Sequence, residues 1–579
     1  MIRSSRFVVA LALVACGKAG DGGAAGKAGA GGATAGASDP NAAGAAVAPV
    51  GAITECPKSL GGPEKQHRVI SKDCGVVPVT EDLVIDGGSL TLEAGASLAF
   101  KDGVGLTVGF NEPAKLIIKG TAEAPVVFTS GGDRAAGVWR GVTLHAKASR
   151  SSVEGLVIEY AGAGDEAALR VEAGEVTVTG TAIRESKTGL VVGETGGFLA
   201  FSGNEFKKIG RPAAIEAPPQ ALGGLGGGNR FDGGAFVLVL GGTVKKSARW
   251  APIGAPLVIS EAVGVDGDGG QRTTLELAAG LELKFAEPGG LTVGYYDNAA
   301  LVVKGTADAP VTFTAQDRRE AGAWSGVKIH GSGEATVERA VFEFAGRDER
   351  GALDVEGGAL SLRSTTLRSD KLGVKANAAA RLTAFADNTF VATPVAISLP
   401  ANLVGGLGEG NGFDKDAKIL VTGETVKGKT TWRAQGVPLQ LEGEVGVEGE
   451  LTLEAGLALL AGPEAAIKVG YYEAGALIGK GTAAAPVTIG PADTARGTWP
   501  GILLEGKSSG SSLEHLTLTG AANDSAVFVR SPAGARLDNV TCSKCSGAVV
   551  GWDCGARVSS SQVLAADGTP KIEAKPEGC

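Results

Sequence analysis

One sequence block occurs three times along this chain and sets the period of whatever it folds into. The copies read Lys-Gly-Thr-Ala-x-Ala-Pro-Val and begin at Lys119, Lys304 and Lys480. A tryptophan two residues before a glycine follows each copy, at Trp139, Trp324 and Trp499. A long period of this kind predicts tandem copies of one structural unit. We place the units at residues 53–245, 246–428 and 429–579, the last of which ends early and carries a cysteine cluster.

Each unit consists of short apolar runs separated by turn residues. Runs such as Leu90–Leu92, Leu106–Val108 and Val142–Leu144 have the alternating or β-branched character of brief strands, with Gly, Asp, Asn and Pro between them. The 93 glycines in 579 residues exclude a long coiled coil, and their lack of a three-residue period excludes collagen. No stretch shows a sustained helical stripe. The chain is therefore predicted to be all-β.

Two all-β architectures compete for such a pattern. Tandem β-sandwiches use longer strands and Asn-Gly or Asp-Gly hairpin turns, which are scarce here. A parallel β-helix uses two or three short strands per coil, and asparagines in Gly203–Phe206 and Asp387–Phe390 are suited to turns that stack between coils. The repeated block with its Trp-x-Gly resembles bacterial right-handed parallel β-helix proteins of the pectate-lyase-like fold. The resemblance implies a solenoid of roughly 20–25 coils. It implies no activity, because that fold serves lyases, adhesins and passive surface proteins.

The N-terminus carries a targeting signal. Arg3 and Arg6 precede a short apolar run that ends in Leu13-Val14-Ala15-Cys16, which looks like the lipobox of bacterial lipoproteins. The resemblance implies that residues 1–15 are a signal peptide and that Cys16 becomes a lipid-bearing N-terminus. By analogy, Gly17 favours the outer membrane of a Gram-negative bacterium, at the cell surface or on the periplasmic face. An ordinary signal peptide with an incidental cysteine is the alternative. Residues 16–52 are predicted to be a flexible Gly/Ala-rich linker.

Six further cysteines lie only at the two ends of the predicted solenoid, as expected for disulfides in an exported protein. They are Cys56, Cys74, Cys542, Cys545, Cys554 and Cys579. Cys56 and Cys74 are isolated from the rest and are expected to pair. The last four allow three connectivities, and the sequence does not choose among them. For Cys542-x-x-Cys545 a structural staple is favoured over a zinc or redox site.

The titratable residues suggest neither a catalytic site nor a cofactor. His145 and His330 occupy the same repeat position, where the third unit has Glu505, so we expect solvated residues at strand ends. Asp266 and Asp268 are the best calcium candidates, but a turn with two outward aspartates is the favoured interpretation. We therefore predict no catalytic residue, no metal and no enzyme.

Aromatic residues suggest one kind of binding. Tyr295-Tyr296 and Tyr471-Tyr472 are equivalent to Phe110, each just after Val-Gly. Exposed rings recurring along a solenoid could stack on sugars, whereas buried ones would be ordinary packing. Packing is favoured, because the position is tied to the repeated block.

Net charge and targeting together define the expected role. A formal charge of −9 and a pI near 5.3 predict no nucleic-acid partner. We expect a lipid-anchored cell-envelope β-helix with a structural, adhesive or binding role, attached to the membrane through its lipid. The alternative is a polysaccharide-binding or polysaccharide-cleaving β-helix, and a third possibility is a spacer that binds another envelope protein.

Overall fold

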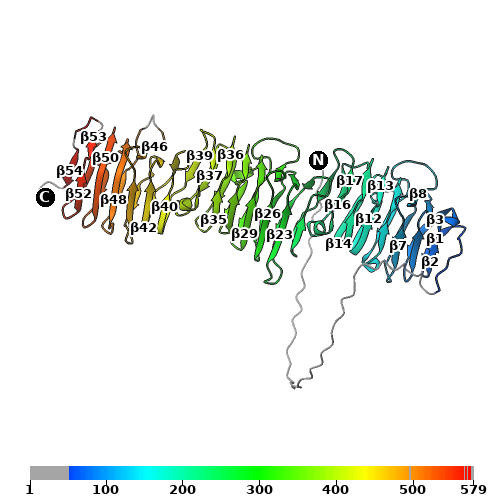
Figure 1. The fold of residues 1–579 in the computed structure, drawn as a ribbon. Coiled ribbons are helices and arrows are strands. Elements are labelled where there is room, and N and C mark those ends of the chain that lie inside the picture. Colours follow the sequence, from blue (N-terminus) through cyan, green and yellow to red (C-terminus); the bar gives the residue numbers. More distant parts are fainter. Residues whose placement is uncertain (1–50, 494–496, 566, 570, 576–579) are drawn as a thin grey trace, which may run out of the picture. The chain divides into compact units, whose positions relative to one another are not determined.

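The computed structural model describes residues 51–493, 497–565, 567–569 and 571–575. The predicted signal peptide, Cys16, nearly all of the linker and Cys579 lie outside them. The described residues form a parallel β-solenoid of about 20 coils, drawn in Figure 1. Among these residues, no helix is long and apolar enough to cross a membrane.

Successive strands of one coil lie in three different columns, and each column is a parallel sheet that runs along the solenoid. Unit two shows the arrangement in β23 (Thr273–Ala278), β24 (Glu282–Phe285) and β25 (Gly290–Val293). The next coil repeats it with β26 (Ala299–Lys304), β27 (Val311–Ala315) and β28 (Val327–His330). β23 pairs with β26, β24 with β27 and β25 with β28, always in parallel. In the described part of the chain every ladder between named strands is parallel, which rules out the hairpins of a β-sandwich.

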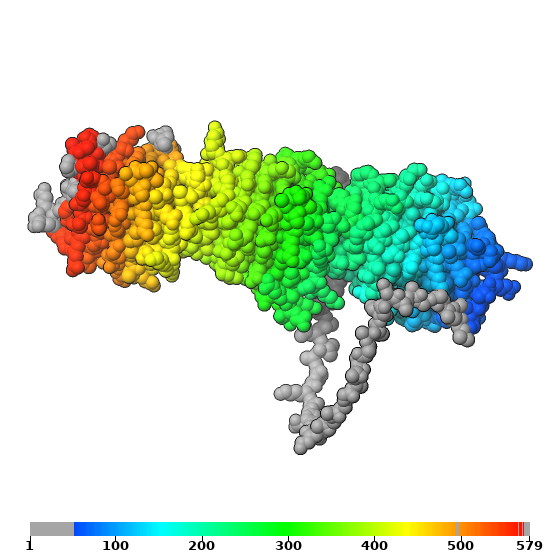
Figure 2. Space-filling model, in the orientation of Figure 1, coloured from blue at the N-terminus to red at the C-terminus, as the bar shows by residue number. Residues whose placement is uncertain are grey.

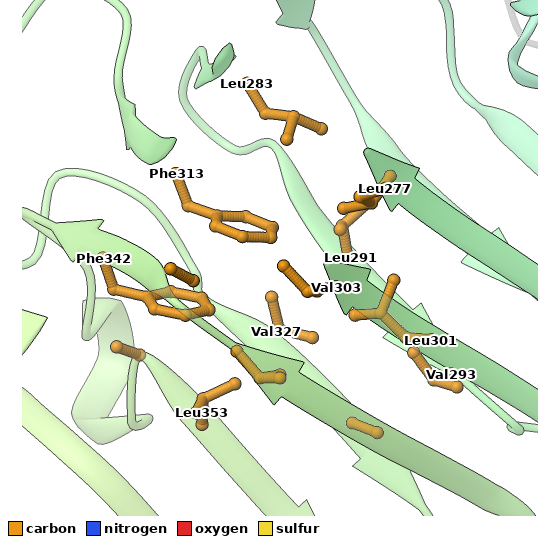
Figure 3. Packing of buried hydrophobic residues seen from close by; sticks show 14 of the residues in the cluster. Leu277, Leu283, Leu291, Val293, Leu301, Val303, Phe313, Val327, Phe342 and Leu353 are labelled. Atoms are coloured by element: carbon orange, nitrogen blue, oxygen red, sulfur yellow. The ribbon is translucent and has the colours of Figure 1, made fainter. Parts of the chain in front are cut away.

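Inward-pointing aliphatic and aromatic side chains from the three columns fill the interior. Figure 3 shows Leu277, Phe313 and Val327 from different columns pointing towards one another. Flat rings stack along one column, with Trp324 on Phe285 at 4.0 Å and Phe313 on β30's Phe342 at 4.4 Å between ring centroids (β30, Ala340–Glu343). Along each strand, inward apolar residues alternate with outward polar ones. Strands of three to six residues therefore each contribute side chains to the core.

Tryptophans and asparagines fix the corners of the coils. The tryptophans after the repeated block are fully buried, and Trp139 and Trp324 donate their indole N–H to backbone carbonyls at 2.7 and 2.8 Å. Asn204 is also buried, and its backbone N–H donates to Asn229 Oδ1 at 3.0 Å in the next coil. Asn388 repeats this contact with Asn411 at 3.2 Å. The stacked asparagines predicted from the sequence are thus confirmed.

Consecutive units are rotated by one column. The column of β6 (Gly105–Val108) runs through β9 (Gly141–Leu144) and on to β18 (Phe236–Val239), β21 (Leu257–Ile259) and β24. In sequence, however, β24 matches β5 (Ser97–Phe100), and the strand that matches β6 is β25 in the neighbouring column. One unit is therefore seven coils plus one strand.

The same shift recurs at the second junction. The column of β25 continues through β39 (Lys418–Val421) into β41 (Leu439–Leu441) and β43 (Ala458–Ala461). The match of β25 is β44 (Ile467–Val469), which again lies in the next column. Despite these shifts the three units form one continuous body, and Figure 2 shows the colours succeeding one another as bands along it.

Disulfides lie near both ends of the solenoid. The structure joins Cys56 to Cys74, as expected, and Cys542 to Cys545. Cys554 is also disulfide-bonded. A disulfide at Cys542 and Cys545 favours the staple over a zinc site, since a zinc ligand must be a thiolate.

Candidate binding site at three aromatic turns

The most distinctive surface feature is a turn that follows β6, β25 and β44. We call residues 109–112, 294–297 and 470–473 the aromatic turns. Their rings are exposed, at 60% for Phe110, 58% and 81% for Tyr295 and Tyr296, and 54% and 74% for Tyr471 and Tyr472. The expectation that these rings pack internally was wrong. Core space beside β5 and β24 is filled instead by the tryptophans, which stack on Phe100 and Phe285.

A glycine opens each aromatic turn for a steric reason. Gly109, Gly294 and Gly470 have φ of 66°, 67° and 70°, a region that side chains disfavour. A Cβ on Gly109 would lie 2.3 Å from the backbone nitrogen of Ala148, and one on Gly470 would lie 2.3 Å from that of Ser508. The close approach to the next coil therefore fixes where the rings emerge.

A buried carboxylate holds each aromatic turn from below. Asp266 Oδ1 accepts hydrogen bonds from the N–H groups of Tyr296 and Asp297 at 3.0 and 3.2 Å. Glu448 accepts the corresponding bonds from Tyr472, at 2.9 Å, and from Glu473. Asp266 therefore points inward as a cap for the turn, and the favoured interpretation as an outward aspartate was wrong for this residue. Asp268 is exposed.

Asp86 supplies the same cap in unit one. It accepts from the N–H groups of Asn111 and Glu112 at 3.0 and 3.1 Å. Burial alone would raise the pKa of Asp86, but the hydrogen bonds from Glu112 and Asn111 outweigh it and lower the pKa below its usual value. The sequence held a signal for these caps, because each acid follows a β-branched residue and precedes a glycine in Ile85-Asp86-Gly87, Val265-Asp266-Gly267 and Val447-Glu448-Gly449.

A second side chain supports the rings from the next coil. His145 contacts Phe110 and His330 contacts Tyr295 edge-on, at 4.9 and 4.8 Å between ring centroids. Both histidines lie at strand ends, as expected, but they are half-buried rather than fully solvated. Burial, aided by the positive charge of Lys328, lowers the pKa of His330, which is neutral at pH 7.

The outer face beside the turns changes its chemistry between units. At one register position the residue is Arg170 in unit one, Asp354 in unit two and Phe528 in unit three. Arg170 lies 3.6 Å from carboxylates of both Glu166 and Glu172. Burial raises the pKa of Asp354, which lies in register between Lys328 and Lys375. A charge reversed or lost at equivalent positions is typical of local pairing rather than of one repeated reaction.

No metal site emerges from the described residues, where no group of three or more His, Cys, Asp or Glu is placed to hold an ion. No family model matches this chain, and a search of curated proteins found no match. The fold places it among parallel β-solenoid proteins, and the case for its function rests on the aromatic turns.

Proposed function

We propose that this chain is a non-catalytic cell-envelope scaffold whose solenoid presents the aromatic turns as binding surfaces in a structural or adhesive role. The observation that carries the proposal is the exposure of large rings at one equivalent position in every unit. Five of the nine exposed large hydrophobic residues described lie in these turns. Clustered exposed apolar groups are typical of binding sites. The glycine and the carboxylate cap hold the backbone of each turn. The rings are therefore not needed for packing the core and are free to serve binding.

Attachment to the outer membrane is part of the same proposal. It rests on the lipobox-like Leu13–Cys16 and on the Gly/Ala-rich linker that follows. Acylated Cys16 would hold the solenoid at the envelope, since two or more acyl chains anchor stably. Mass spectrometry of the N-terminal peptide tests this, and Cys16→Ser should release the protein from the membrane fraction. Recovery of an unmodified Cys16 in the wild-type chain would contradict the anchor.

Binding is tested by replacing rings while leaving the fold intact. A Tyr296→Ala, Tyr472→Ala chain should lose most retention on a panel of immobilised neutral and acidic polysaccharides. The matched control is Leu199→Ala with Val391→Ala, which removes exposed apolar side chains outside the turns. Capture from intact envelopes covers the other partner class, another envelope protein. Equal retention of the ring variant and the control would reject the aromatic turns as the binding surface.

Asp354 favours a second candidate, polysaccharide cleavage on the outer face of β28 and β31 (Leu353–Glu356). A carboxyl group whose pKa is raised by burial and that lies in register between Lys328 and Lys375 is suited to general acid chemistry. Acidic polysaccharides assayed with and without calcium test it. Turnover that disappears in Asp354→Asn would replace the non-catalytic proposal, and we expect none.

A further inference from the structure

The three aromatic turns project from three different columns. Each follows the strand that matches β6, and these strands lie one column further round the solenoid in each successive unit. Recurrence in the sequence alone would suggest that the rings form one line along a single face. The structure shows that they do not. A straight ligand lying along one face meets only one aromatic turn.

Axial spacing separates the turns as well. A unit of seven coils plus one strand, at the ~4.8 Å spacing of paired strands, advances the turn by about 35 Å along the axis. Neighbouring turns thus differ in both height and direction. Each is a separate site for any ligand shorter than this separation.

The chemistry of each turn favours an uncharged sugar. Tyr295 and Tyr296 meet edge to face at 4.5 Å, and Tyr471 and Tyr472 at 4.6 Å, so each pair offers an exposed ring face with fixed orientation. A carboxylate follows the rings in every turn, as Glu112, Asp297 and Glu473. Carboxylates accept hydrogen bonds from sugar hydroxyls and repel uronates.

The lysines near the turns already have partners: Lys65 lies 3.6 Å from the Glu112 carboxylate and Lys468 pairs with Glu444. Lys147 Nζ donates to the Asn111 carbonyl and Lys507 Nζ to the Tyr472 carbonyl. Both lysines therefore brace the turns. In the two tyrosine turns this leaves Asp297 and Glu473 as the charged groups that immediately follow the rings, which again favours a neutral partner over an anionic one.

We propose that the protein is a multivalent binder of neutral glycans in which each aromatic turn stacks on a pyranose ring of a separate polysaccharide chain. This inference rests on the proposed binding role and adds ligand charge and valency to it. One protein molecule would link two polysaccharide chains through its two tyrosine turns. It would hold a third polysaccharide chain more weakly, through the single ring of Phe110. Linking chains that lie in different directions suits a protein that joins surface polymers into a network.

Calorimetric titration with cellotetraose, a short neutral probe, tests the valency. Every protein variant in these experiments also carries Cys16→Ser, so that lipid-bearing protein molecules cannot associate in micelles. We expect two equivalent sites and a weaker third. Tyr295→Ala with Tyr296→Ala should remove one strong site and leave the affinity of the other within about twofold, because the sites are far apart. Leu199→Ala with Val391→Ala is the matched control.

Light scattering with hydroxyethyl cellulose, a long neutral chain, tests cross-linking. Wild-type protein should raise scattering strongly, and a chain with only one intact aromatic turn should not. Saturation at one cellotetraose per protein, or tighter binding of polygalacturonate than of the neutral probe, would overturn this inference while leaving the binding role. Failure to bind any polysaccharide in the panel would overturn the glycan inference, and retention of an envelope protein through the same rings would then preserve the binding role alone.

Discussion

Asp370 is a fully buried carboxyl group between β33 (Thr366–Arg368) and β34 (Leu372–Ala376). Its Oδ1 accepts the Ala345 N–H at 2.7 Å, while Oδ2 has no hydrogen-bond partner. Burial raises the pKa of Asp370 to about 8, so the folded protein keeps the group protonated at neutral pH. The unfolded chain releases this proton near pH 4. Folding stability should therefore fall as pH rises from about 4 to about 8.

Replacing Asp370 by serine tests this pH dependence. Ser186 occupies the matching position in unit one, where its Oγ accepts the Ala161 N–H at 3.1 Å and donates to the Arg184 carbonyl at 3.0 Å. We expect Asp370→Ser to gain on the order of a few kcal/mol at pH 8 and little at pH 4, because serine does not ionise. The measurement is the thermal unfolding midpoint against pH. Parallel profiles for the variant and the wild type would contradict the assignment.

Asp266 offers a residue-scale test of the turn cap. Asp266→Ala leaves the partly buried Tyr296 and Asp297 N–H groups without their acceptor, a loss of about 1 kcal/mol. Both amides should then exchange hydrogen faster. Asp266→Asn keeps an acceptor oxygen and should restore most of the protection. The control is Asp268→Ala, in an exposed position, and equal exchange in both alanine variants would show that the cap is unimportant.

At the scale of strands and coils, two fully buried tryptophans differ in whether their indole N–H has a partner. Trp324 Nε1 donates to the Glu343 carbonyl at 2.8 Å, whereas Trp432 Nε1, equally buried on β40 (Glu424–Trp432), has no partner. Trp324→Phe should therefore cost about 1–2 kcal/mol more than Trp432→Phe, although both remove the same volume. Denaturant unfolding of the two variants measures the difference. Equal losses would mean that the indole hydrogen bond contributes nothing.

Short-range pattern was enough to predict the elements and much of their packing. Runs such as Leu90–Leu92 lie in strands and Asn204 stacks on Asn229, because each depends on local alternation or turn chemistry. The aromatic turns were harder. Tyr296 lies next to residues that recur in every unit. Those residues are compatible with an exposed ring or a buried one, and only the position of the next coil decides between them.

At the scale of the whole molecule, the rotation of the units was invisible in the sequence. Repeat alignment equates β6 with β25, but it does not say which column either strand joins, since any inward aliphatic fits any column. Strand pairing decides this, and it depends on how many strands intervene. The rotation turns three equivalent rings into three differently directed sites, and so it determines how a ligand can be held.

Cysteine cross-linking at the second unit junction tests this rotation most directly. The structure pairs Leu420 of β39 with Gln440 of β41, whereas units stacked without rotation would pair Leu420 with Gly446 of β42 (Val445–Glu454). Under mild oxidation, peptide mapping should find a disulfide in Leu420→Cys with Gln440→Cys and none in Leu420→Cys with Gly446→Cys. The reverse result would place the aromatic turns of units two and three in one column and contradict the rotation between these units.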